Sequence, residues 1–295
     1  MKTNVCIIGA GPAGLISAIF AAQSKAKVVV IEKNQAPGRK LLLTGGGRCN
    51  ITHTGTVDEF VRAYGKSGRF LRHCLHEFSP EATREFFNQI GIGTKVDEDP
   101  ASLRYAVASG CVFPVTERAG DVRDALLSQC LKLGVQFIFG RGADKIEKRG
   151  DGFSVFTGSE ITSAGKVIIA TGGMSYPATG STGDGYKLAK SLRNTIIEPR
   201  PALVPLVSTE DWRAELAGIS RDNVTISAVV NKKKVSVSGP MIFTHDGISG
   251  PAVLDLSRLL VDCLPAKTPI EIAIDLVPTM NESQLEEYLM GQLSQ

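Results

Sequence analysis

The chain has 295 residues, of which 43% are hydrophobic and 21% are charged, proportions typical of a folded globular protein. A chain of this length exceeds one ordinary hydrophobic core, so we expect two domains. The 33 basic and 30 acidic side chains leave a net charge of +3, and this small excess argues against a nucleic-acid partner and against an anionic membrane surface.

Cysteine usage and hydropathy bear on the compartment. The six cysteines form no CxxC pair and no dense framework, which is typical of proteins kept in a reducing environment. No signal peptide precedes the first expected strand, and no run of about 20 apolar residues occurs. We therefore expect a cytoplasmic protein that does not enter a membrane.

The first 32 residues predict a βαβ unit. The apolar residues 5–8 have the length of a buried strand, residues 15–22 form an Ala-rich helical stretch, and residues 28–31 form a second strand that ends at the acid Glu32. Strand and helix are joined by a glycine-rich turn made of Gly9, Ala10, Gly11, Pro12, Ala13 and Gly14. Glycines alone would also suit a purely structural turn, but here strand, helix and acid all fall at the spacing of the dinucleotide fingerprint.

Each part of this unit has a physical reason. The first glycine permits the tight turn, Gly11 lets a pyrophosphate approach the backbone, and Gly14 lets helix and strand pack closely. The N-terminus of the helix offers free N–H groups and the positive end of its dipole to phosphates. Glu32, with Lys33 beside it, is placed to accept hydrogen bonds from ribose hydroxyls.

A second glycine-rich stretch follows at residues 38–52. Three consecutive glycines beside basic residues suit neither a helix nor a packed strand, and a flexible surface loop is the alternative to a ligand-binding loop. Its position directly after the βαβ unit favours cofactor contact, with the basic side chains reaching phosphates. The expected cofactor residues are Arg39, Lys40, Thr44, Gly45, Gly46, Gly47, Arg48, Cys49 and Asn50.

The middle of the chain is expected to be helical and then β-rich. Helical pieces between residues 60 and 75 are interrupted by Gly65 and Gly68, a helix capped by Ser79 runs to about residue 90, and an amphipathic helix covers residues 121–133. His73 and His76 share a helix face, but no further ligand pair completes a metal site, so we expect no metal. Strands are expected at residues 135–139, 144–148, 152–157 and 166–170.

Two segments of this region are expected to meet the cofactor. Ala143 leaves the carboxyl end of one strand, where a backbone edge could contact an adenine, although a surface turn fits nearly as well. Residues 166–170 form an expected buried strand that leads into Thr171, Gly172 and Gly173, and ligands lie at the carboxyl ends of such strands. Asp184 is expected to cap a helix that reaches Leu192.

Around residue 198 the sequence pattern changes from alternating strands and helices to short β segments. Prolines mark a linker, and short strands are expected at residues 224–230, 235–237 and 270–276, the first two joined as a hairpin by a solvated lysine turn. Pro251 opens a helix to about Leu260, and another begins at Asn281. We expect a nucleotide-binding domain over residues 1–198, a β-rich domain over 199–277 and the start of a helical part over 278–295.

The run of motifs resembles the BaiN-like (YhiN-like, aminoacetone-oxidase-like) bacterial flavoproteins. The resemblance covers essentially the whole chain, and the motif from Gly45 to Asn50 is the most specific part of it. The matching motifs are GxGPAG (9–14), GRKLL (38–42), TGGGRCN (44–50), VFP (112–114), ATGG (170–173), TGSTGDG (179–185) and FTHxGISGP (243–251).

This resemblance implies an α/β fold: a Rossmann-like FAD-binding domain with an inserted β-rich domain and a helical domain. Three features depart from the family pattern: Cys111 replaces a basic residue, Arg193–Asn194 replaces Gly–His, and family members continue past residue 295 with a Gly-rich return segment. On this basis we expect the chain to be truncated and to hold the flavin loosely.

The function expected from the resemblance is FAD-dependent oxidoreduction of a small-molecule substrate, with transient use of NAD(P)H over the flavin. The alternatives are a non-catalytic nucleotide-binding remnant and a single-Rossmann NAD-dependent dehydrogenase. A lone NAD site would need neither the second glycine-rich stretch nor the Thr171–Gly173 return. For catalysis the sequence offers Arg48, Cys49 and His245 as candidates. Arg48 is expected to lie near the flavin, whereas Cys49 also fits the role of a small packing residue and His245 that of a hydrogen-bonded turn residue.

Overall fold

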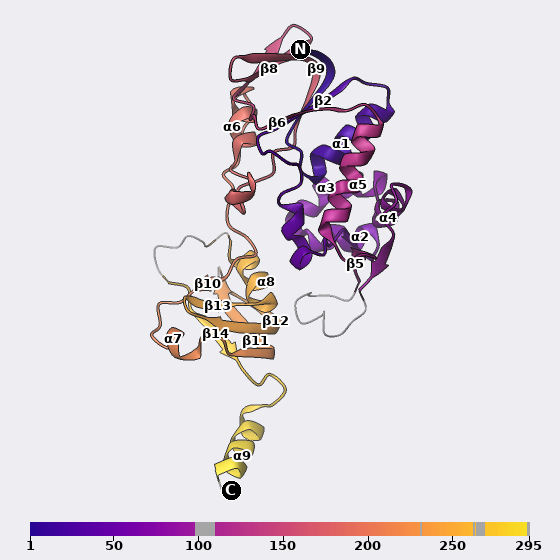
Figure 1. Cartoon of the computed structure of the whole chain (residues 1–295). Coiled ribbons are helices and arrows are strands. Elements are labelled where there is room, and N and C mark those ends of the chain that lie inside the picture. Colours follow the sequence, from indigo (N-terminus) through magenta and orange to yellow (C-terminus); the bar gives the residue numbers. More distant parts are fainter. Residues whose placement is uncertain (98–109, 231, 262, 264–268, 294–295) are drawn as a thin grey trace. The chain divides into compact units, whose positions relative to one another are not determined.

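The computed structural model describes residues 1–97, 110–230, 232–261, 263 and 269–293. These residues form two compact units (Figure 1), one made of residues 1–97 and 110–198 and the other of the described residues from 199 onward. The expected division into three parts, with a helical part from residue 278, stays a prediction.

The first unit is built on a six-stranded sheet in the order β6-β2-β1-β9-β8-β7. The expected βαβ unit is present and opens it: β1 (Lys2–Ile8), α1 (Pro12–Gln23) and β2 (Val28–Glu32), with β1 and β2 parallel. β6 (Gln136–Phe139) extends the parallel part beside β2. β7 (Lys145–Arg149) and β8 (Gly152–Thr157) form an antiparallel pair at the other side.

β9 (Glu160–Ile169) differs from its expected extent. It is ten residues long, pairs antiparallel with β8 through its first half, and then runs parallel to β1. The sequence shows only its apolar end, residues 166–170, and predicts that end to be buried, whereas Val167, Ile168 and Ile169 are half-buried. The polar first half becomes a strand because β8 supplies hydrogen-bond partners, which is a tertiary effect that local hydropathy does not record.

Side-chain alternation places apolar residues on both faces of this sheet. Ile7, Val28 and Val30 pack with Leu15 and Ile19 of α1 and with Val122 and Leu126 of α5 (Ala119–Lys132), and Figure 1 shows these two helices side by side. Cys6, Ile8, Val29 and Ile31 point to the opposite face, against Leu188 of α6 (Asp184–Ser191) and against β7 and β8. Because the central strands are covered on both faces, their sequences are continuous apolar runs and do not alternate with polar residues.

Between β2 and β6 the chain forms a helical segment and a small sheet. The helices are α2 (Val57–Ala63), α3 (Gly68–Glu77) and α4 (Pro80–Gln89), and the strands are β3 (Thr52–His53), β4 (Thr94–Val96) and β5 (Cys111–Pro114), in the order β3-β5-β4. The breaks at Gly65 and Gly68 and the cap by Ser79, whose hydroxyl accepts from the N–H of Ala82, agree with the sequence.

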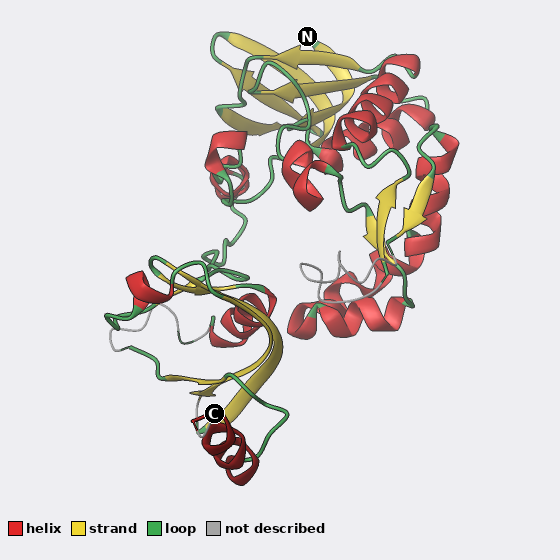
Figure 2. Ribbon diagram, turned by 60° about the horizontal axis from the view of Figure 1, so that its bottom comes forward, coloured by secondary structure: helices red, strands yellow, loops and turns green. Residues whose placement is uncertain are grey.

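The second unit is a five-stranded antiparallel sheet with a helix packed on it (Figure 2). Its strands, in the order β10-β13-β12-β11-β14, are β10 (Leu206–Val207), β11 (Ser220–Val230), β12 (Lys233–Thr244), β13 (Gly247–Ser249) and β14 (Ile272–Asp275). The helices are α7 (Arg213–Leu216), α8 (Pro251–Leu260) and α9 (Glu282–Leu293). Val253 and Leu256 of α8 pack on Ile226 and Phe243 of the sheet, which forms a separate core.

Among the described helices, none combines the length and the apolar composition that a membrane span requires.

Candidate functional site

The three glycines of the first turn serve different purposes. A Cβ on Gly9, whose φ is +104°, would overlap the carbonyl oxygen of Ala170, and a Cβ on Gly14 would overlap the carbonyl oxygen of Gly9. Backbone packing within the protein therefore requires glycine at both positions. Gly11 has an ordinary φ of −73°, and no heavy atom of the described residues lies within 4 Å of the place where its Cβ would stand. Neither the backbone conformation nor packing against the described residues therefore requires a glycine at position 11.

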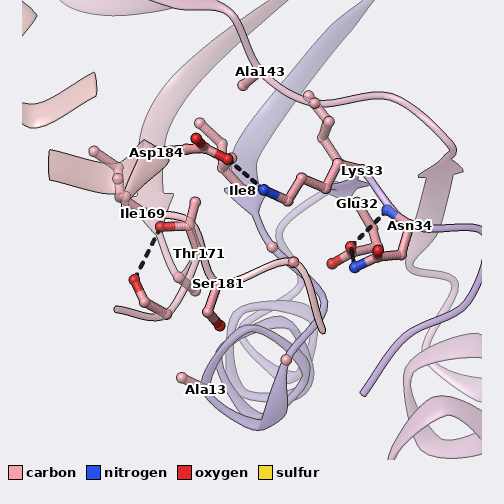
Figure 3. Close-up of a pocket in the computed structure, with 18 of the residues that line it drawn as sticks. Ile8, Ala13, Glu32, Lys33, Asn34, Ala143, Ile169, Thr171, Ser181 and Asp184 are labelled. Carbon is pink, nitrogen blue, oxygen red and sulfur yellow. Dashed lines mark hydrogen bonds and ion pairs between the residues drawn. The ribbon is translucent and has the colours of Figure 1, made fainter. Parts of the chain in front are cut away.

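The space in front of Gly11 belongs to a cavity of about 580 Å³ at the carboxyl ends of β1, β2 and β9 (Figure 3). This volume is in the range of small-molecule and cofactor sites. Of the residues expected to bind a cofactor, the cavity is lined by Gly9, Gly11, Pro12, Ala13, Glu32, Lys33, Arg39, Lys40, Ala143, Thr171 and Gly172. The chain thus brings four segments that are far apart in sequence to one edge of the sheet, as open α/β sheets do at their ligand crevice.

Helix α1 points its N-terminus at this cavity. Gly11 is the N-cap and offers no side chain, Pro12 occupies the first turn, and that turn carries no acidic residue. The N–H groups of the first turn have no partner within the helix, and the helix dipole adds a positive potential there. The arrangement suits an anionic group such as a pyrophosphate.

Glu32 is buried, with 7% of its surface exposed, although it lines the cavity. Its Oε2 accepts from the N–H of Ala10 at 2.7 Å, and its Oε1 accepts from the backbone N–H of Asn34 at 2.8 Å and from Asn34 Nδ2 at 2.7 Å. The carboxylate is therefore fixed against the glycine-rich turn. Ala10 holds this acid through its backbone and does not itself line the cavity.

Asp184 does not cap α6 as expected. The N-cap is Gly183, which provides no side chain, and Asp184 is the first helical residue. Its carboxylate is instead 2.6 Å from Lys33 Nζ, and it accepts from the hydroxyl of Thr182 at 3.0 Å. The hydrogen bond from Lys33 lowers the pKa of Asp184 below its ordinary value. Lys33 is a better partner for this carboxylate than the helix's own backbone N–H groups, because it brings a full charge.

The cavity also contains residues that sequence reasoning did not assign to it. They come from the end of β2, from the loop before α6 and from the first turn of α6: Asn34, Thr179, Gly180, Ser181, Asp184 and Tyr186. Asn34 links the end of β2 to this loop, since its Nδ2 also donates to the carbonyl of Thr179 at 3.2 Å. The TGSTGDG motif at residues 179–185 is the sequence feature that could have indicated these residues, but its contact with the end of β2 depends on tertiary structure.

Residues 44–50 of the second glycine-rich stretch lie outside the lining of this cavity, although Arg39 and Lys40 of the same stretch belong to it. The stretch forms 3-10 turns over Leu41–Gly47, broken by left-handed backbone at Gly45 and Gly46. A Cβ on Gly45 would come within 2.8 Å of the Phe113 ring, whereas around Gly46 the described residues leave more than 4 Å of open space. Gly45 is thus required by packing, and Gly46 leaves its backbone open to a ligand. Gly173 is absent from the lining too, but its neighbours Thr171 and Gly172 are present.

Arg48, expected to reach phosphates, has protein partners in the structure. Its Nη1 lies 3.1 Å from Asp97 Oδ2 and 3.8 Å from Glu117 Oε1, and its guanidinium stands 4.1 Å from the centroid of the Phe113 ring. One third of the side chain is exposed. These contacts give Arg48 a structural role, and a role toward the cofactor stays a prediction.

The other two catalytic candidates have contrasting surroundings. Cys49 is buried with 4% exposure and a left-handed φ of +68°, and this burial raises the pKa of its thiol. A thiol with a raised pKa is a poor nucleophile at neutral pH. His245 is exposed in the turn between β12 and β13 of the second unit. Catalytic roles for Cys49 and His245 stay predictions.

The chain has several recognisable relatives. It is 30% identical to the 3-dehydro-bile acid delta(4,6)-reductase of Clostridium scindens over 287 residues, which cover 96% of this chain and 67% of the relative. It is 30% identical to the ribosomal RNA dihydrouridine synthase of Escherichia coli (87% of this chain, 60% of the relative) and 31% identical to that of Haemophilus influenzae (93% and 64%). The chain thus spans about two thirds of the length of these relatives.

A solved structure agrees with the fold. The open conformation of a flavocytochrome c3 fumarate reductase superposes with a TM-score of 0.53 at 18% identity, over 75% of this chain and 47% of that chain. At this identity the likeness concerns the fold alone, and it confirms the expected α/β class with a Rossmann-like sheet.

The relatives correct one expectation. The small net charge of +3 argues against a nucleic-acid partner, but two relatives carry names that refer to ribosomal RNA. The argument from charge is wrong because net charge averages over the whole surface. An enzyme that acts on one base needs only a local contact with the nucleic acid, and such a contact can leave the overall charge near zero.

The family itself follows from a match along most of the chain. The model of the HI0933-like protein Rossmann domain matches residues 3–257, a span that includes both glycine-rich stretches, the Ala170–Gly173 return and strands β10 to β13 of the second unit. With this match and the identity to the bile-acid reductase, the resemblance predicted from the motifs is confirmed. The chain belongs to the HI0933-like family of Rossmann-domain proteins.

Proposed function

We propose that the protein is an FAD-dependent oxidoreductase that moves a hydride between an organic substrate and the flavin N5. The observation that carries this proposal is Gly11, a glycine with ordinary backbone angles and open space where its Cβ would be, at the N-terminus of a helix that faces a 580 Å³ cavity. Glycine at a position where neither backbone angles nor packing requires it is explained by a ligand group, here a pyrophosphate, that lies directly against the backbone.

The residues present fit the adenosine diphosphate part of FAD. We propose that the backbone at Gly11 and the N-terminus of α1 bind the pyrophosphate, that Glu32 accepts from the ribose, and that the backbone at Ala143 borders the adenine. Thr44–Asn50 and Thr171–Gly173 are proposed to contact the flavin. The flavin, when bound, supplies a hydride donor or acceptor at N5, and the chain contributes binding, orientation and electrostatics.

We propose a carbon–carbon double bond conjugated to a carbonyl as the substrate group. The names of the relatives support this, because a delta(4,6)-reductase of a 3-oxo compound and a synthase of dihydrouridine both saturate such a bond. Two substrate classes follow, a small 3-oxo polycyclic compound and a uracil base in RNA. The RNA class is included because two of the relatives bear that name. In this proposal, transiently bound NAD(P)H reduces the flavin, and the substrate or oxygen re-oxidises it.

We also propose that the protein works in the cytoplasm, because each of its six cysteines is a free thiol in the structure and free thiols persist in reducing compartments. The proposed organisation keeps the nucleotide-binding domain at residues 1–198, the β-rich domain at 199–277 and a helical part from 278.

The test is the visible absorption spectrum of the purified protein, after saturation with FAD and removal of the excess. A stoichiometric flavin spectrum that NAD(P)H bleaches without oxygen would support the proposal. The reduced protein is then mixed with a 3-oxo-Δ4 steroid or with uridine-containing ribosomal RNA, and return of the yellow colour identifies the substrate class. A protein that binds NAD and leaves FAD in the wash would contradict the proposal.

A further inference from the structure

Asn34 is the residue around which the adenosine side of the cavity is assembled. It follows β2 by two residues, and each of its four polar groups has a partner. Its backbone N–H and its Nδ2 donate to Glu32 Oε1, its Nδ2 also donates to the carbonyl of Thr179, its Oδ1 accepts from Arg39 Nη1 at 3.1 Å, and its carbonyl accepts from the N–H of Gly140 at 3.0 Å. An asparagine suits this place because its amide carries an NH2 group with two donor hydrogens and a separate acceptor oxygen.

The loop before α6 is shaped around this side chain. Gly180 has a φ of +101°, and a Cβ on it would come within 2.6 Å of Asn34 Nδ2. Gly180 therefore leaves room for the amide to lie between Glu32 and Thr179. Figure 3 shows Asn34 and Glu32 directly beside each other at the cavity wall, joined by hydrogen bonds.

We infer that Asn34 is a positioning residue that fixes the Glu32 carboxylate for a ribose ligand, so that the Asn34–Gly180 pair sets the affinity of the site for adenosine. The inference rests on the proposed FAD site, in which Glu32 accepts from the ribose hydroxyls. Without its two hydrogen bonds from Asn34, Oε1 of a buried carboxylate loses its orientation, and the side chain turns toward other donors.

The substitution Asn34→Asp separates this role from general structure. Aspartate keeps the oxygen that accepts from Arg39, but it replaces Nδ2 with an anionic oxygen next to Glu32 Oε1 and the Thr179 carbonyl. Two carboxylates at this distance repel each other, so Glu32 is displaced. Asn88→Asp is the matched control, because Asn88 is exposed on α4 and does not line the cavity.

The experiment measures the binding of ADP and of 2′,3′-dideoxy-ADP to the chain by calorimetry. We expect Asn34→Asp to weaken ADP by roughly tenfold or more, the effect of losing a hydrogen bond to a charged group. Dideoxy-ADP has no ribose hydroxyl for Glu32 to bind, so its affinity should change by no more than about twofold. Asn88→Asp should leave both affinities at the parent values.

The possible results separate this inference from the proposed function. Equal losses for both ligands, or no loss for ADP, would overturn the role of Asn34 and leave the FAD proposal intact. A parent chain that does not bind ADP would overturn both. If circular dichroism shows that Asn34→Asp does not fold, Gly180→Ala takes its place, since its Cβ pushes Nδ2 away from Glu32. The same ADP-specific loss is expected from it, and its absence would overturn the inference.

Discussion

The backbone N–H of Ala10 donates to Oε2 of Glu32 over 2.7 Å in the buried interior of the first unit. This hydrogen bond joins the glycine-rich turn after β1 to the acid at the end of β2, which lies 22 residues further along the chain. The turn and the acid are therefore parts of one structure. The shape of the turn that is proposed to bind the pyrophosphate depends on the same carboxylate that is proposed to bind the ribose.

From this relationship we predict that Glu32→Gln weakens both the fold and the site. An amide offers one oxygen where the carboxylate uses two, so either Ala10 or Asn34 loses its acceptor. Loss of a buried charged acceptor costs about 1–3 kcal/mol, and we expect the free energy of unfolding and the affinity for ADP each to fall by an amount in that range. Urea denaturation and calorimetric titration measure the two.

The control for this variant is Glu198→Gln, which alters an exposed side chain outside the cavity. It should change neither quantity. If Glu32→Gln bound ADP as tightly as the parent, the ribose contact assigned to Glu32 would be wrong.

The sequence predicts this part of the fold well because its signals are local. Strand length, the spacing of Gly9, Gly11 and Gly14, and the acid after β2 are all readable within 32 residues. The same holds for α8, expected from Pro251 to about Leu260 and found with these bounds. Pro at the first helical position and an apolar face with helical spacing give this signal without any tertiary information.

Where tertiary contacts decide, the sequence predicts less. The polar residues that open β9 become a strand because β8 lies beside them. The carboxylate of Asp184 binds Lys33, which directly follows β2, and does not cap α6. Asn34 carries no motif, and its importance comes from Thr179 and Glu32, which are far apart in the chain. Such contacts appear only when the four segments around the cavity are placed together.

A second prediction concerns stability at alkaline pH. Burial raises the pKa of the Cys6 and Cys130 thiols from 9.0 to about 12, and both side chains have no exposed surface. Below pH 9 both the folded and the unfolded chain hold these protons, so stability does not depend on them. Between pH 9 and 12 the unfolded chain releases them and the folded chain does not, so the free energy of unfolding falls by about 1.4 kcal/mol per pH unit for each thiol.

Urea denaturation at a series of pH values measures this slope. Cys130→Ala removes one of the two thiols, and its slope above pH 9 should be smaller than that of the parent by one thiol's share. Cys74→Ala, at an exposed position, should keep the parent slope. Equal slopes for the parent and Cys130→Ala would show that this thiol titrates normally in the folded state.

A third prediction separates the two halves of the proposed cofactor site. Arg48 lies outside the cavity lining, against Asp97 and Phe113, in the stretch proposed to contact the flavin. We expect Arg48→Ala to weaken FAD while leaving ADP at its parent affinity, because ADP contains only the adenosine half. The lost contact with Phe113 should also lower the free energy of unfolding by about 0.5–1 kcal/mol. Parallel titrations with FAD and ADP measure the two affinities, and equal losses of affinity for both nucleotides would refute the flavin contact of Arg48.

The fourth prediction uses the different reasons for the glycines at positions 11 and 14. In Gly11→Ala the new methyl group meets no atom of the described residues, and φ is already suitable for alanine. The free energy of unfolding should therefore change by less than about 1 kcal/mol. The methyl group enters the place where the pyrophosphate must approach, so binding of ADP and FAD should be lost. In Gly14→Ala the methyl group overlaps the carbonyl oxygen of Gly9, and the helix must move from the sheet at a cost of about 1–3 kcal/mol. Gly11→Ala should thus abolish nucleotide binding in a stable protein, whereas Gly14→Ala should lower the stability of the protein even without nucleotide.

Thermal unfolding without ligand, followed by nucleotide titration, distinguishes the two variants. A Gly11→Ala protein that is folded and binds ADP normally would show that the space in front of Gly11 is not the pyrophosphate site.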